Sequence, residues 1–343
     1  MRSAANRFHC GDVLYSRLRP YLNKVHRATT NGLCSAEFIV LPPTEALDAD
    51  FLRYRLNASD FVRFANALDE GDRPRVDFGQ ISAFEFWLPP LPTQHRIVQA
   101  IEEKLSRLDA AQSALLRAQA NLKRYRASVR LEACSRAIEC APLRPFGDFL
   151  AHIESGKSFK CEERPPKLGE VGVAKVSAVT WGEYDEQQTK TCKDESRIEE
   201  RYLIKSHDFL FTRANTIELI GACVIAQQVS LAVMLSDKIL RFHFIDEIDM
   251  RWALIWLKSP FGRKEIERLS TGNQESMRNI GQERIRQIQI AVPPLEIQQK
   301  IVAEVERNLT LITRTEQSLQ TQLTRAKRLR QSILQQAFAP GLA

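Results

Sequence analysis

Apolar residues recur at helical intervals in two long stretches of the chain. The first stretch, residues 93–141, contains neither Gly nor Pro, and its apolar positions are Ile97, Ile101, Leu105, Leu108, Leu115, Leu122, Tyr125 and Val129. Steps of three, four and seven predict one long helix with a narrow apolar stripe. Thr93 is the expected N-cap, and Pro142 and Pro145 are expected to end the helix. Because so narrow a stripe cannot form a globular core alone, the helix is expected to pack against a partner helix.

The second stretch follows Pro293-Pro294-Leu295 and ends before Pro340, with apolar positions at Ile301, Val305, Leu309, Ile312, Leu319, Leu323, Leu329 and Ile333. It matches the first when Pro89-Pro90-Leu91 is aligned with Pro293-Pro294-Leu295: Gln94 falls on Gln298, Ile97 on Ile301, Lys123 on Lys327 and Ser128 on Ser332. This internal repeat of about two hundred residues is far longer than a solenoid repeat, so the repeated units are domain-sized. Two unrelated amphipathic helices would not keep prolines, glutamine and basic pairs in register.

Each helix is preceded by a mixed segment with the same order of elements. In the first segment we expect strands at 12–17, 36–41 and 84–88, helical spacing at 49–68 and a polar, basic loop at 69–77. In the second we expect strands at 208–213, 236–242 and 288–292, a helix at 250–257 and a polar loop at 269–279. The second segment also has an N-terminal section, residues 146–203 with a strand near 171–176, that has no counterpart in the first. Either the first unit is naturally short or the chain is truncated.

Composition narrows the class of protein. The chain has 343 residues, enough for two or three domains, and no apolar run approaches a membrane span or a signal peptide, so a cytoplasmic location is expected. Its seven cysteines and six histidines show no C-x-x-C or H-x-x-x-H spacing, so reduced thiols are expected and a metal site is not. A net charge of +7 permits a polyanionic partner without requiring one.

Signals of other chemistry are weak. Gly156-Lys157-Ser158 resembles the end of a phosphate-binding loop, but that motif needs Gly where Ala151 stands. The Asn-Pro-Pro-aromatic run of amino-methyltransferases is absent. Glu183, Asp185 and Glu186 fit a surface acidic patch better than a catalytic group, and Cys134 and Cys140 fit small apolar helix positions. No catalytic residue is predicted.

Three features of the sequence together resemble one protein family. They are the duplicated Pro-Pro-Leu helix starts with their Gln and Ile-Val positions (89–98 and 293–302), the strand at 12–17 and the order domain–helix–domain–helix. The chain resembles the specificity subunit of type I DNA restriction–modification systems over nearly its whole length. It departs from the family pattern in lacking roughly the first third of the first target-recognition domain.

The resemblance implies an α+β fold with two mixed α/β target-recognition domains separated by two long helices that form an antiparallel coiled coil. The implied boundaries are a truncated first recognition domain at 1–91, a central spacer helix at 92–141, a second recognition domain at 142–292 and a C-terminal spacer helix at 293–343. Each domain would read one half of a bipartite site in the DNA major groove, where donor and acceptor patterns distinguish all base pairs. A helix of about 45 residues is roughly 65–70 Å long, close to two turns of duplex at ~34–36 Å each, so the helices would set the unread spacer.

The resemblance also implies partners. The subunit would be non-catalytic and bind no cofactor itself. Methyltransferase subunits would dock on it, restriction and translocation subunits would join them, and S-adenosylmethionine, ATP and Mg would be bound by those partners. Lysine and arginine side chains would neutralise DNA phosphates and make binding depend on salt.

Candidate DNA-binding residues are side chains able to pair with base edges or phosphates. In the second domain they are Lys157, Ser158, Lys160, Lys175, Ser177, Thr180, Trp181, Arg213, Asn215, Thr216, Asn273, Gln274, Ser276 and Arg278, and in the first domain Arg17, Arg19, Arg73 and Arg75. Any one of them could instead be a solvated loop residue, and Arg17 and Arg213, which end the repeated strand, could be structural. Two further interpretations stay open: a coiled-coil scaffold that bridges proteins and never meets DNA, and an inactive remnant.

Overall fold

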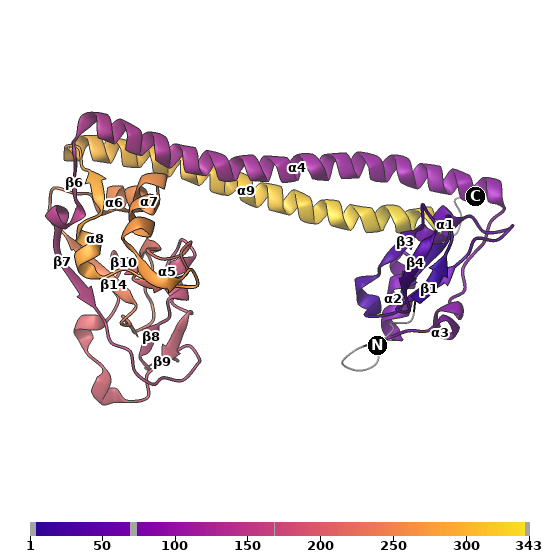
Figure 1. The fold of residues 1–343 in the computed structure, drawn as a ribbon, viewed down its shortest axis with the longest axis horizontal. Helices are drawn as coiled ribbons and strands as arrows, with labels where there is room; N and C mark the ends of the chain where they lie inside the picture. Colours follow the sequence, from indigo (N-terminus) through magenta and orange to yellow (C-terminus); the bar gives the residue numbers. More distant parts are fainter. Residues whose placement is uncertain (1–4, 69–73, 168, 340–343) are drawn as a thin grey trace. The chain divides into compact units, whose positions relative to one another are not determined.

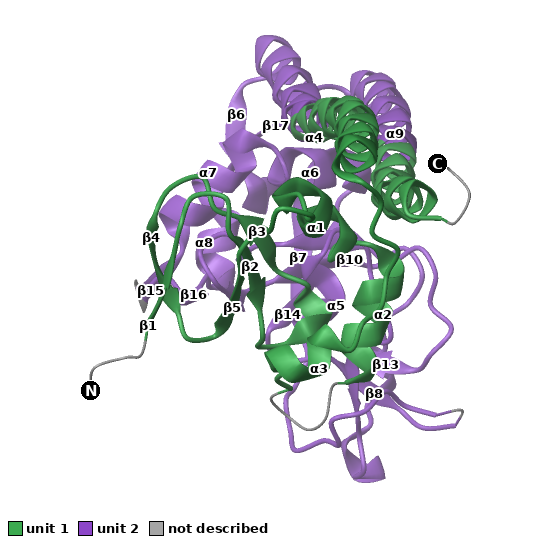
Figure 2. Cartoon of the chain, turned by 90° about the vertical axis from the view of Figure 1, so that its right-hand side faces the viewer, with its two compact units in different colours: residues 1–120, 316–343 green, residues 121–315 purple. Residues whose placement is uncertain are grey.

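The computed structural model describes residues 5–68, 74–167 and 169–339. The chain forms two compact units, unit 1 (residues 1–120 and 316–343) and unit 2 (residues 121–315), coloured separately in Figure 2. Residues 69–73 of the predicted polar loop, including Arg73, lie outside the described residues.

Two long helices are present where the apolar pattern predicts them. They are α4 (Leu91–Cys140) and α9 (Leu295–Ala337) (Figure 1). The carbonyl of Pro90 accepts hydrogen bonds from the amides of Thr93 (2.9 Å) and Gln94 (3.1 Å). The helix therefore begins before Thr93, and the prediction of Thr93 as N-cap is wrong. The reason is that Pro92 is compatible with the first turn, whose amide groups have no partner within the helix.

The two helices pack antiparallel inside each unit. In unit 1, Ile97, Ile101 and Leu105 of α4 share a buried cluster with Ala326, Ile333 and Leu334 of α9. In unit 2, Val129, Ala133 and Ala137 of α4 share one with Ile301, Val305 and Ile312 of α9. The mixed helix-and-sheet fold with two long helices is thus confirmed.

Two predicted stripe positions are wrong, and they are equivalent in the repeat. Tyr125 is 50% exposed and Leu329 is 49% exposed. The buried face instead passes Arg126, whose guanidinium donates to Thr313 Oγ1 (3.2 Å), and Arg330, which pairs with Asp109. Arg126 lies four residues after Leu122 and Arg330 four residues after the buried Ala326, as a 3.6-residue period requires. The long aliphatic part of an arginine side chain can cover apolar surface while its guanidinium group keeps its contacts with polar groups.

Unit 2 is built on an antiparallel four-stranded sheet in the order β12-β10-β14-β7. Its strands are β7 (Leu150–Ser155), β10 (Phe209–Thr212), β12 (Cys223–Ile225) and β14 (Ile239–Phe244). One face packs with α6 (Met250–Leu257) and α7 (Pro260–Leu269) around the buried Trp252 and Trp256. The expected strands at 208–213 and 236–242 and the helix at 250–257 are therefore present.

The other face of that sheet is covered by the N-terminal section of unit 2. A second sheet, β13-β8-β9, and helix α5 bury Ala174, Ala178 and Val179 against Leu210 and Ile239. The bounds are β8 (Gly172–Ala174), α5 (Ser177–Thr180), β9 (Thr189–Thr191) and β13 (Val233–Met234). Short elements connect this section: β6 (Leu143–Pro145) and the 3-10 turns η2 (Phe146–Phe149), η3 (Glu195–Arg197) and η4 (Glu200–Tyr202).

The predicted polar loop at 269–279 is wrong, because these residues form a β-hairpin. Its strands β15 (Thr271–Gln274) and β16 (Met277–Asn279) make a three-stranded sheet with β11 (Ala214–Asn215). Arg278 stabilises the hairpin by donating to the carbonyls of Gly272 and Ser270, both at 2.8 Å. Polar residues thus form strands here through side-chain bonds that an apolar pattern does not reveal. After α8 (Gln282–Arg286), β17 (Gln289–Ala291) pairs with β6 and leads into α9.

Unit 1 contains a smaller version of this architecture. Its sheet has the order β3-β2-β5, and β1 pairs separately with β4. The bounds are β1 (Ala5–Phe8), β2 (Val13–Ser16), η1 (Pro20–Leu22), β3 (Val25–Arg27), β4 (Gly32–Ser35), β5 (Phe38–Leu41), α1 (Ala49–Arg55), α2 (Ser59–Ala67) and α3 (Phe78–Ser82). Helical spacing at 49–68 thus corresponds to two helices.

The predicted strand at 84–88 is wrong. Its counterpart in unit 2, β17, pairs with β6, a strand that directly precedes the N-terminal section of unit 2 and has no counterpart in the described part of unit 1. Without a partner strand, Phe84 and Phe86 pack instead around the Arg55 guanidinium, 4.8 and 5.5 Å from their ring centroids. Arg55 in turn forms two 2.6 Å hydrogen bonds with Asp60.

Matched hydrogen bonds show that the two units repeat one framework. A loop amide donates to the strand-leading aspartate in both, from His9 to Asp12 at 2.7 Å and from Lys205 to Asp208 at 2.8 Å. The arginine that follows the strand makes equivalent backbone hydrogen bonds in both units. In unit 1 the Arg17 amide donates to the Glu37 carbonyl (2.9 Å), and the Arg17 carbonyl accepts from the Val76 amide (3.0 Å). In unit 2 the Arg213 amide donates to the Lys238 carbonyl (2.9 Å), and the Arg213 carbonyl accepts from the Ile280 amide (2.9 Å). Even the left-handed turn before the strand recurs, at Gly11 (φ 95°) and His207 (φ 70°).

A buried glutamine joins each sheet-and-helix segment to its long helix. Gln94 accepts from the Asp48 amide (2.9 Å) and donates to the carbonyls of Ala46 and Pro89, both at 2.7 Å. Gln298 repeats this with the Asp249 amide (2.9 Å), Glu247 O (2.9 Å) and Pro293 O (2.7 Å). Both side chains are fully buried and fully bonded, which explains why the sequence repeat keeps this Gln in register.

Candidate nucleic-acid interface

One group of candidate residues in unit 2 is brought together by α5 and the β11-β16-β15 sheet. Asn215 on β11 lies opposite Arg278 on β16, and the Asn215 amide donates to Thr180 Oγ1 at the end of α5 (3.4 Å). Residues distant in sequence thus share one surface. This group, called the hairpin surface below, contains Thr180, Trp181, Arg213, Asn215, Thr216, Gln274, Ser276 and Arg278.

Some side chains of the hairpin surface hold the hairpin in place, and others are exposed and could contact a ligand. Arg278 is used to hold the hairpin, and Arg213 Nε donates to Asn279 Oδ1 at 3.5 Å. Trp181, by contrast, is 74% exposed, and Gln274 and Ser276 are exposed as well. Asn273 lies in β15, and its side chain is outside what the structure describes. Among the described side chains of this surface, the exposed ones without a hydrogen-bond partner are Trp181, Gln274 and Ser276.

A second group lies after β7. Lys157 pairs with Glu199 (2.6 Å), Ser158 bonds Asp237, and both line a cavity of about 680 Å³ with Ser196 and Arg197. Lys157, followed by Arg201, lowers the pKa of Glu199 below its usual value through hydrogen bonding. Lys157 is therefore already neutralised inside the unit, whereas Lys160 is exposed.

A third group is also engaged within unit 2. Lys175 pairs with Glu163 (3.3 Å), and Ser177 Oγ donates to Gln188 Oε1 (3.0 Å). Lys190, and then Lys175, lower the pKa of Glu163 by hydrogen bonding. These side chains are held by partners rather than presented freely.

In unit 1 the candidates do not form one surface of free cations. Arg75 pairs with Glu37 (2.6 Å), and Arg19 is exposed in a left-handed conformation with φ 54°. Arg17 Nε is buried and has no hydrogen-bond partner among the described residues. Arg17 therefore differs from its repeat equivalent Arg213, whose side chain has a partner.

Sequence reasoning missed residues that support the hairpin surface. Arg263 on α7 donates to the carbonyls of Ile217 (3.2 Å), Glu218 (3.3 Å) and Ile220, which fixes the loop after β11. Lys258 donates to Gly182 O (3.2 Å), next to Trp181. Burial lowers the pKa of Lys258, and the nearby Arg130 adds to that shift. Neither cation belongs to a motif, so the sequence offered no signal for them.

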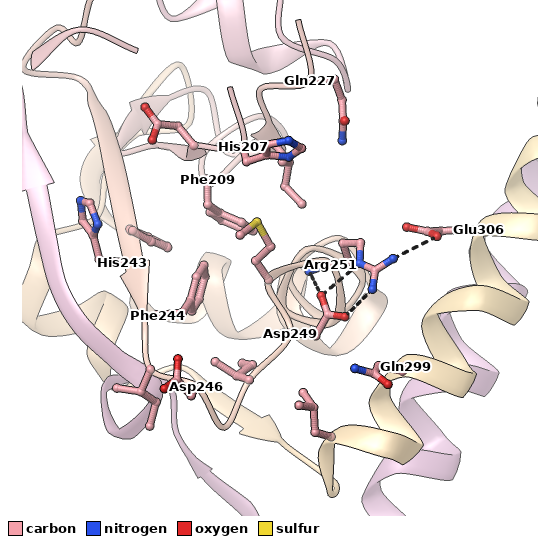
Figure 3. Close-up of a pocket in the computed structure, with 17 residues that line it drawn as sticks. His207, Phe209, Gln227, His243, Phe244, Asp246, Asp249, Arg251, Gln299 and Glu306 are labelled. Carbon is pink, nitrogen blue, oxygen red and sulfur yellow. Dashed lines mark hydrogen bonds and ion pairs between the residues drawn. The ribbon is translucent and has the colours of Figure 1, made fainter. Parts of the chain in front are cut away.

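A separate pocket of about 900 Å³ in unit 2 holds none of the predicted residues. On one side of the pocket, the Arg251 guanidinium lies 2.7 Å from the Asp249 carboxylate and 3.7 Å from the Glu306 carboxylate (Figure 3). His207 and His243 lie on other sides of the pocket. Among the described residues no cluster of three or more His, Cys, Asp and Glu side chains could hold a metal ion. Nor does any described helix have the length and apolar character needed to cross a membrane.

Comparison with known protein families identifies the domain that carries the hairpin surface. Residues 148–325, more than half of the chain, match the model of the type I restriction modification DNA specificity domain. The chain belongs to this family. The match begins in η2, just before β7, and ends within α9, so it includes the four-stranded sheet, the hairpin surface and the start of the second long helix.

Sequence similarity to individual proteins supports the same family. The chain is 32% identical over 194 residues to the Escherichia coli type I restriction enzyme EcoEI specificity subunit, and 22% identical over 315 residues to the EcoKI specificity subunit of strain K12. These alignments cover 55% and 87% of this chain. The chain spans about a third of the EcoEI subunit (33%) and 67% of the EcoKI subunit.

Solved structures share the fold. A chain from work on complex assembly and conformational transition of the type I R-M system matches with a TM-score of 0.76 at 20% identity, covering 100% of this chain and 85% of that one. The HsdS subunit from Thermoanaerobacter tengcongensis matches with a TM-score of 0.56 at 20% identity, covering 98% and 82%. At these identities the likeness concerns the fold alone. The domain boundaries and DNA-binding residues expected from the sequence remain predictions.

Proposed function

We propose that this chain is the non-catalytic DNA-recognition subunit of a type I restriction–modification complex and that the hairpin surface reads DNA bases. The observation that carries the proposal is the placement of Trp181, Gln274 and Ser276 on one fixed surface inside the matched specificity domain. Their free side chains stand on a frame held by Arg263 and Arg278. Base recognition needs such pre-positioned polar groups.

The chemistry of these side chains suits base edges. A glutamine amide can both donate and accept, as adenine recognition in the major groove requires, and a serine hydroxyl can pair with several bases. An exposed indole adds apolar contact to bases or sugar. The exposed Lys160 supplies positive charge for phosphates and a dependence of affinity on salt. We propose the other residues of the hairpin surface, Thr180, Arg213, Asn215, Thr216 and Arg278, as its supports rather than as base contacts.

We further propose that the two long helices act as a spacer between two half-sites. Both are continuous, α4 over 50 residues and α9 over 43. At about 1.5 Å per residue, α4 is roughly 75 Å long, somewhat more than two turns of duplex. Unit 1 would read the second half-site. Methyltransferase and restriction subunits would dock on the chain and bind S-adenosylmethionine, ATP and Mg, which this chain would not bind itself.

A methylation map tests the proposal. The chain is co-expressed with its cognate methyltransferase subunit, and modified adenines are located across the genome. The expected result is a split motif with a fixed gap. A palindromic motif would mean that two copies of unit 2 read DNA and that unit 1 does not. An assembled complex without new methylation would contradict the proposal and favour a protein scaffold.

A matched pair of variants locates the base contacts. Gln274→Ala with Ser276→Ala should change the bases of one half-site or abolish methylation, because each lost base contact costs about 1–3 kcal/mol. Gln317→Ala, an exposed glutamine on α9, should leave the motif unchanged. An unchanged motif in both variants would remove the hairpin surface from the reading of bases.

A further inference from the structure

Two half-buried cations of unit 2 lie together next to the loop that follows α5. Lys258 ends α6, and its ammonium group donates to the Gly182 carbonyl in that loop (3.2 Å). Arg130 on α4 lies close enough to Lys258 to lower the pKa of the ammonium group, although burial lowers it more. One turn further along α4, the Cys134 thiol hydrogen-bonds with Ser259, the residue after Lys258. The long helix and the end of α6 therefore bring two positive charges to one place.

Within the described residues, no carboxylate pairs with Arg130. Burial lowers the pKa of its guanidinium and the neighbouring Arg126 lowers it further, while its other titratable neighbours are two cysteine thiols. Glu183 acts on Lys258, but the Glu183 side chain is exposed to water. A cation that loses water without gaining a carboxylate lowers the stability of the folded chain. An anion bound from outside would offset this loss.

The internal repeat shows that the shared framework does not require these two charges. In the alignment of the long helices, Arg130 is equivalent to Leu334, which is 3% exposed and belongs to the apolar cluster of unit 1. Counted from the aspartates whose amides bond the buried glutamines, Lys258 is equivalent to Asn57. Unit 1 thus folds with an uncharged residue at both positions. The cations of unit 2 are therefore not needed for packing.

The location of the two cations indicates which anion they bind. Lys258 holds Gly182, the residue after Trp181, and the exposed indole of Trp181 belongs to the hairpin surface. A duplex whose bases reach that surface brings its sugar–phosphate backbone to the rim of the surface, where protein cations usually contact DNA. Arginine can bind two phosphate oxygens at once, and lysine adds a point charge.

We propose that Arg130 and Lys258 together bind one backbone phosphate of the DNA whose bases lie on the hairpin surface. The inference rests on the proposed function and extends it, because α4 then contacts the DNA directly in addition to spacing the half-sites. The bound phosphate fixes the position of the duplex against unit 2 without reading its sequence. Unit 1 carries Leu334 and Asn57 at the equivalent positions, so this contact belongs to unit 2.

The salt dependence of DNA binding tests the inference. The full chain is assembled with its methyltransferase subunits, and its affinity for a duplex carrying the methylated motif is measured at several salt concentrations. Arg130→Leu should weaken binding about tenfold and reduce the slope of log affinity against log salt by about 0.9, the value for one phosphate. The methylated motif should stay the same, because a phosphate contact carries no base information. Arg124→Leu is the matched control, since Arg124 is exposed on another face of α4, and it should leave the slope unchanged.

Duplexes with single uncharged phosphates locate the contact. Methylphosphonate replaces one phosphate at a time, and one position should weaken binding by the unaltered complex. The same replacement should have little further effect on Arg130→Leu or Lys258→Met, because both changes then remove the same contact. Inorganic phosphate is the second probe. If it raises the melting temperature of the unaltered chain but not of Arg130→Leu, and no methylphosphonate position depends on Arg130, the site binds a free anion and the inference is overturned.

Thermal stability separates a binding role of Arg130 from a structural one. Because the repeat has a buried leucine at this position, Arg130→Leu should raise the melting temperature of the full chain by about 2–4 °C. A lower melting temperature, an unchanged salt slope, or an equal loss of slope in Arg124→Leu would overturn the inference. If the unaltered complex binds no DNA, the proposed function fails and this inference fails with it. If binding and motif are intact but Arg130→Leu keeps the slope, only this inference fails.

Discussion

Unit 1 and unit 2 share a backbone framework but differ in how their sheets are completed. In both, an aspartate caps the turn before the first core strand, and a buried glutamine joins the unit to its long helix. Within the described residues, only unit 2 has a fourth strand in its main sheet and a three-stranded sheet over its core. The difference extends to single residues: a buried arginine, Arg241, faces the fourth strand in unit 2, and Val40 stands at the open edge in unit 1. The two units therefore share a backbone framework although their main sheets differ in the number of described strands.

The largest expected effect comes from Arg241, which is 4% exposed and bonds two carboxylates. Arg241→Met leaves Glu154 and Asp208 without their cation, so we expect unit 2 to lose about 3–5 kcal/mol of unfolding free energy. The buried Trp252 and Trp256 report this unfolding by fluorescence. Val40→Met, the equivalent change in unit 1, should alter stability by less than about 1 kcal/mol. Equal losses would contradict the difference between the two positions.

Shortening a buried side chain in the apolar stripe of the long helices should lower the stability of both units. Ile101→Ala in unit 1 and its equivalent Val305→Ala in unit 2 each remove a fully buried side chain, with an expected loss of about 2–4 kcal/mol for the isoleucine and less for the smaller valine. Tyr125→Ala and Leu329→Ala are the matched controls, because both side chains are half exposed. Calorimetry measures all four. A control as destabilising as its buried counterpart would show that the stripe follows the spacing first read from the sequence.

Gln94→Met and Gln298→Met should give equal, intermediate effects. Each change keeps the side-chain volume but removes three buried hydrogen bonds, for an expected loss of about 1–3 kcal/mol. Urea titration of each variant measures it. If only one of the two variants were destabilised, the equivalence of the two junctions would fail.

The smallest expected effect is a pH dependence confined to unit 2. Burial lowers the pKa of His243, and the stacked His152 and nearby Arg241 add to this, while Glu154 opposes it. A depressed folded pKa means that the unfolded chain takes up the proton more readily. Stability is therefore full above the unfolded pKa near 6.5 and decreases as pH falls through the folded pKa.

The control for this effect is the variant His243→Asn. Its melting temperature should depend less on pH between about 7.5 and 5.5 than that of the unaltered chain. The equivalent position in unit 1 is Pro42, which cannot titrate. An unchanged pH slope in the variant would assign the dependence to other groups.

Much of the fold follows from the sequence because helix periodicity and the duplicated prolines are local signals. The two long helices, the strand before Arg17 and its repeat before Arg213 are of this kind. The hairpin at Thr271–Asn279 and the missing strand at 84–88 were not predictable, since they depend on partners elsewhere in the chain: Arg278 with Ser270, and β6, which the described part of unit 1 lacks.

The candidate site was predictable only in part for the same reason. Residue types at 157, 175 and 278 suit DNA contact, but Lys157 is paired with Glu199, Lys175 with Glu163, and Arg278 with backbone carbonyls. A sequence shows the cation but not the distant carboxylate that occupies it. Trp181, Gln274 and Ser276 stand out only once their exposure is known.

Hydrogen exchange of individual backbone amides tests the comparison of the two units most directly. In β14, the amide of Ile239 donates to the Ser236 carbonyl (3.2 Å) and β7 covers the edge at Arg241, so both amides should exchange slowly. In β5, the amides of Phe38 and Val40 should exchange fast while those of Ile39 and Leu41, which bond to β2, stay protected. Fast exchange at alternate residues of β5 and uniform protection of β14 are the predicted result. Equal protection of Phe38, Ile39, Val40 and Leu41 would show that the edge of unit 1 is already covered and would contradict the account.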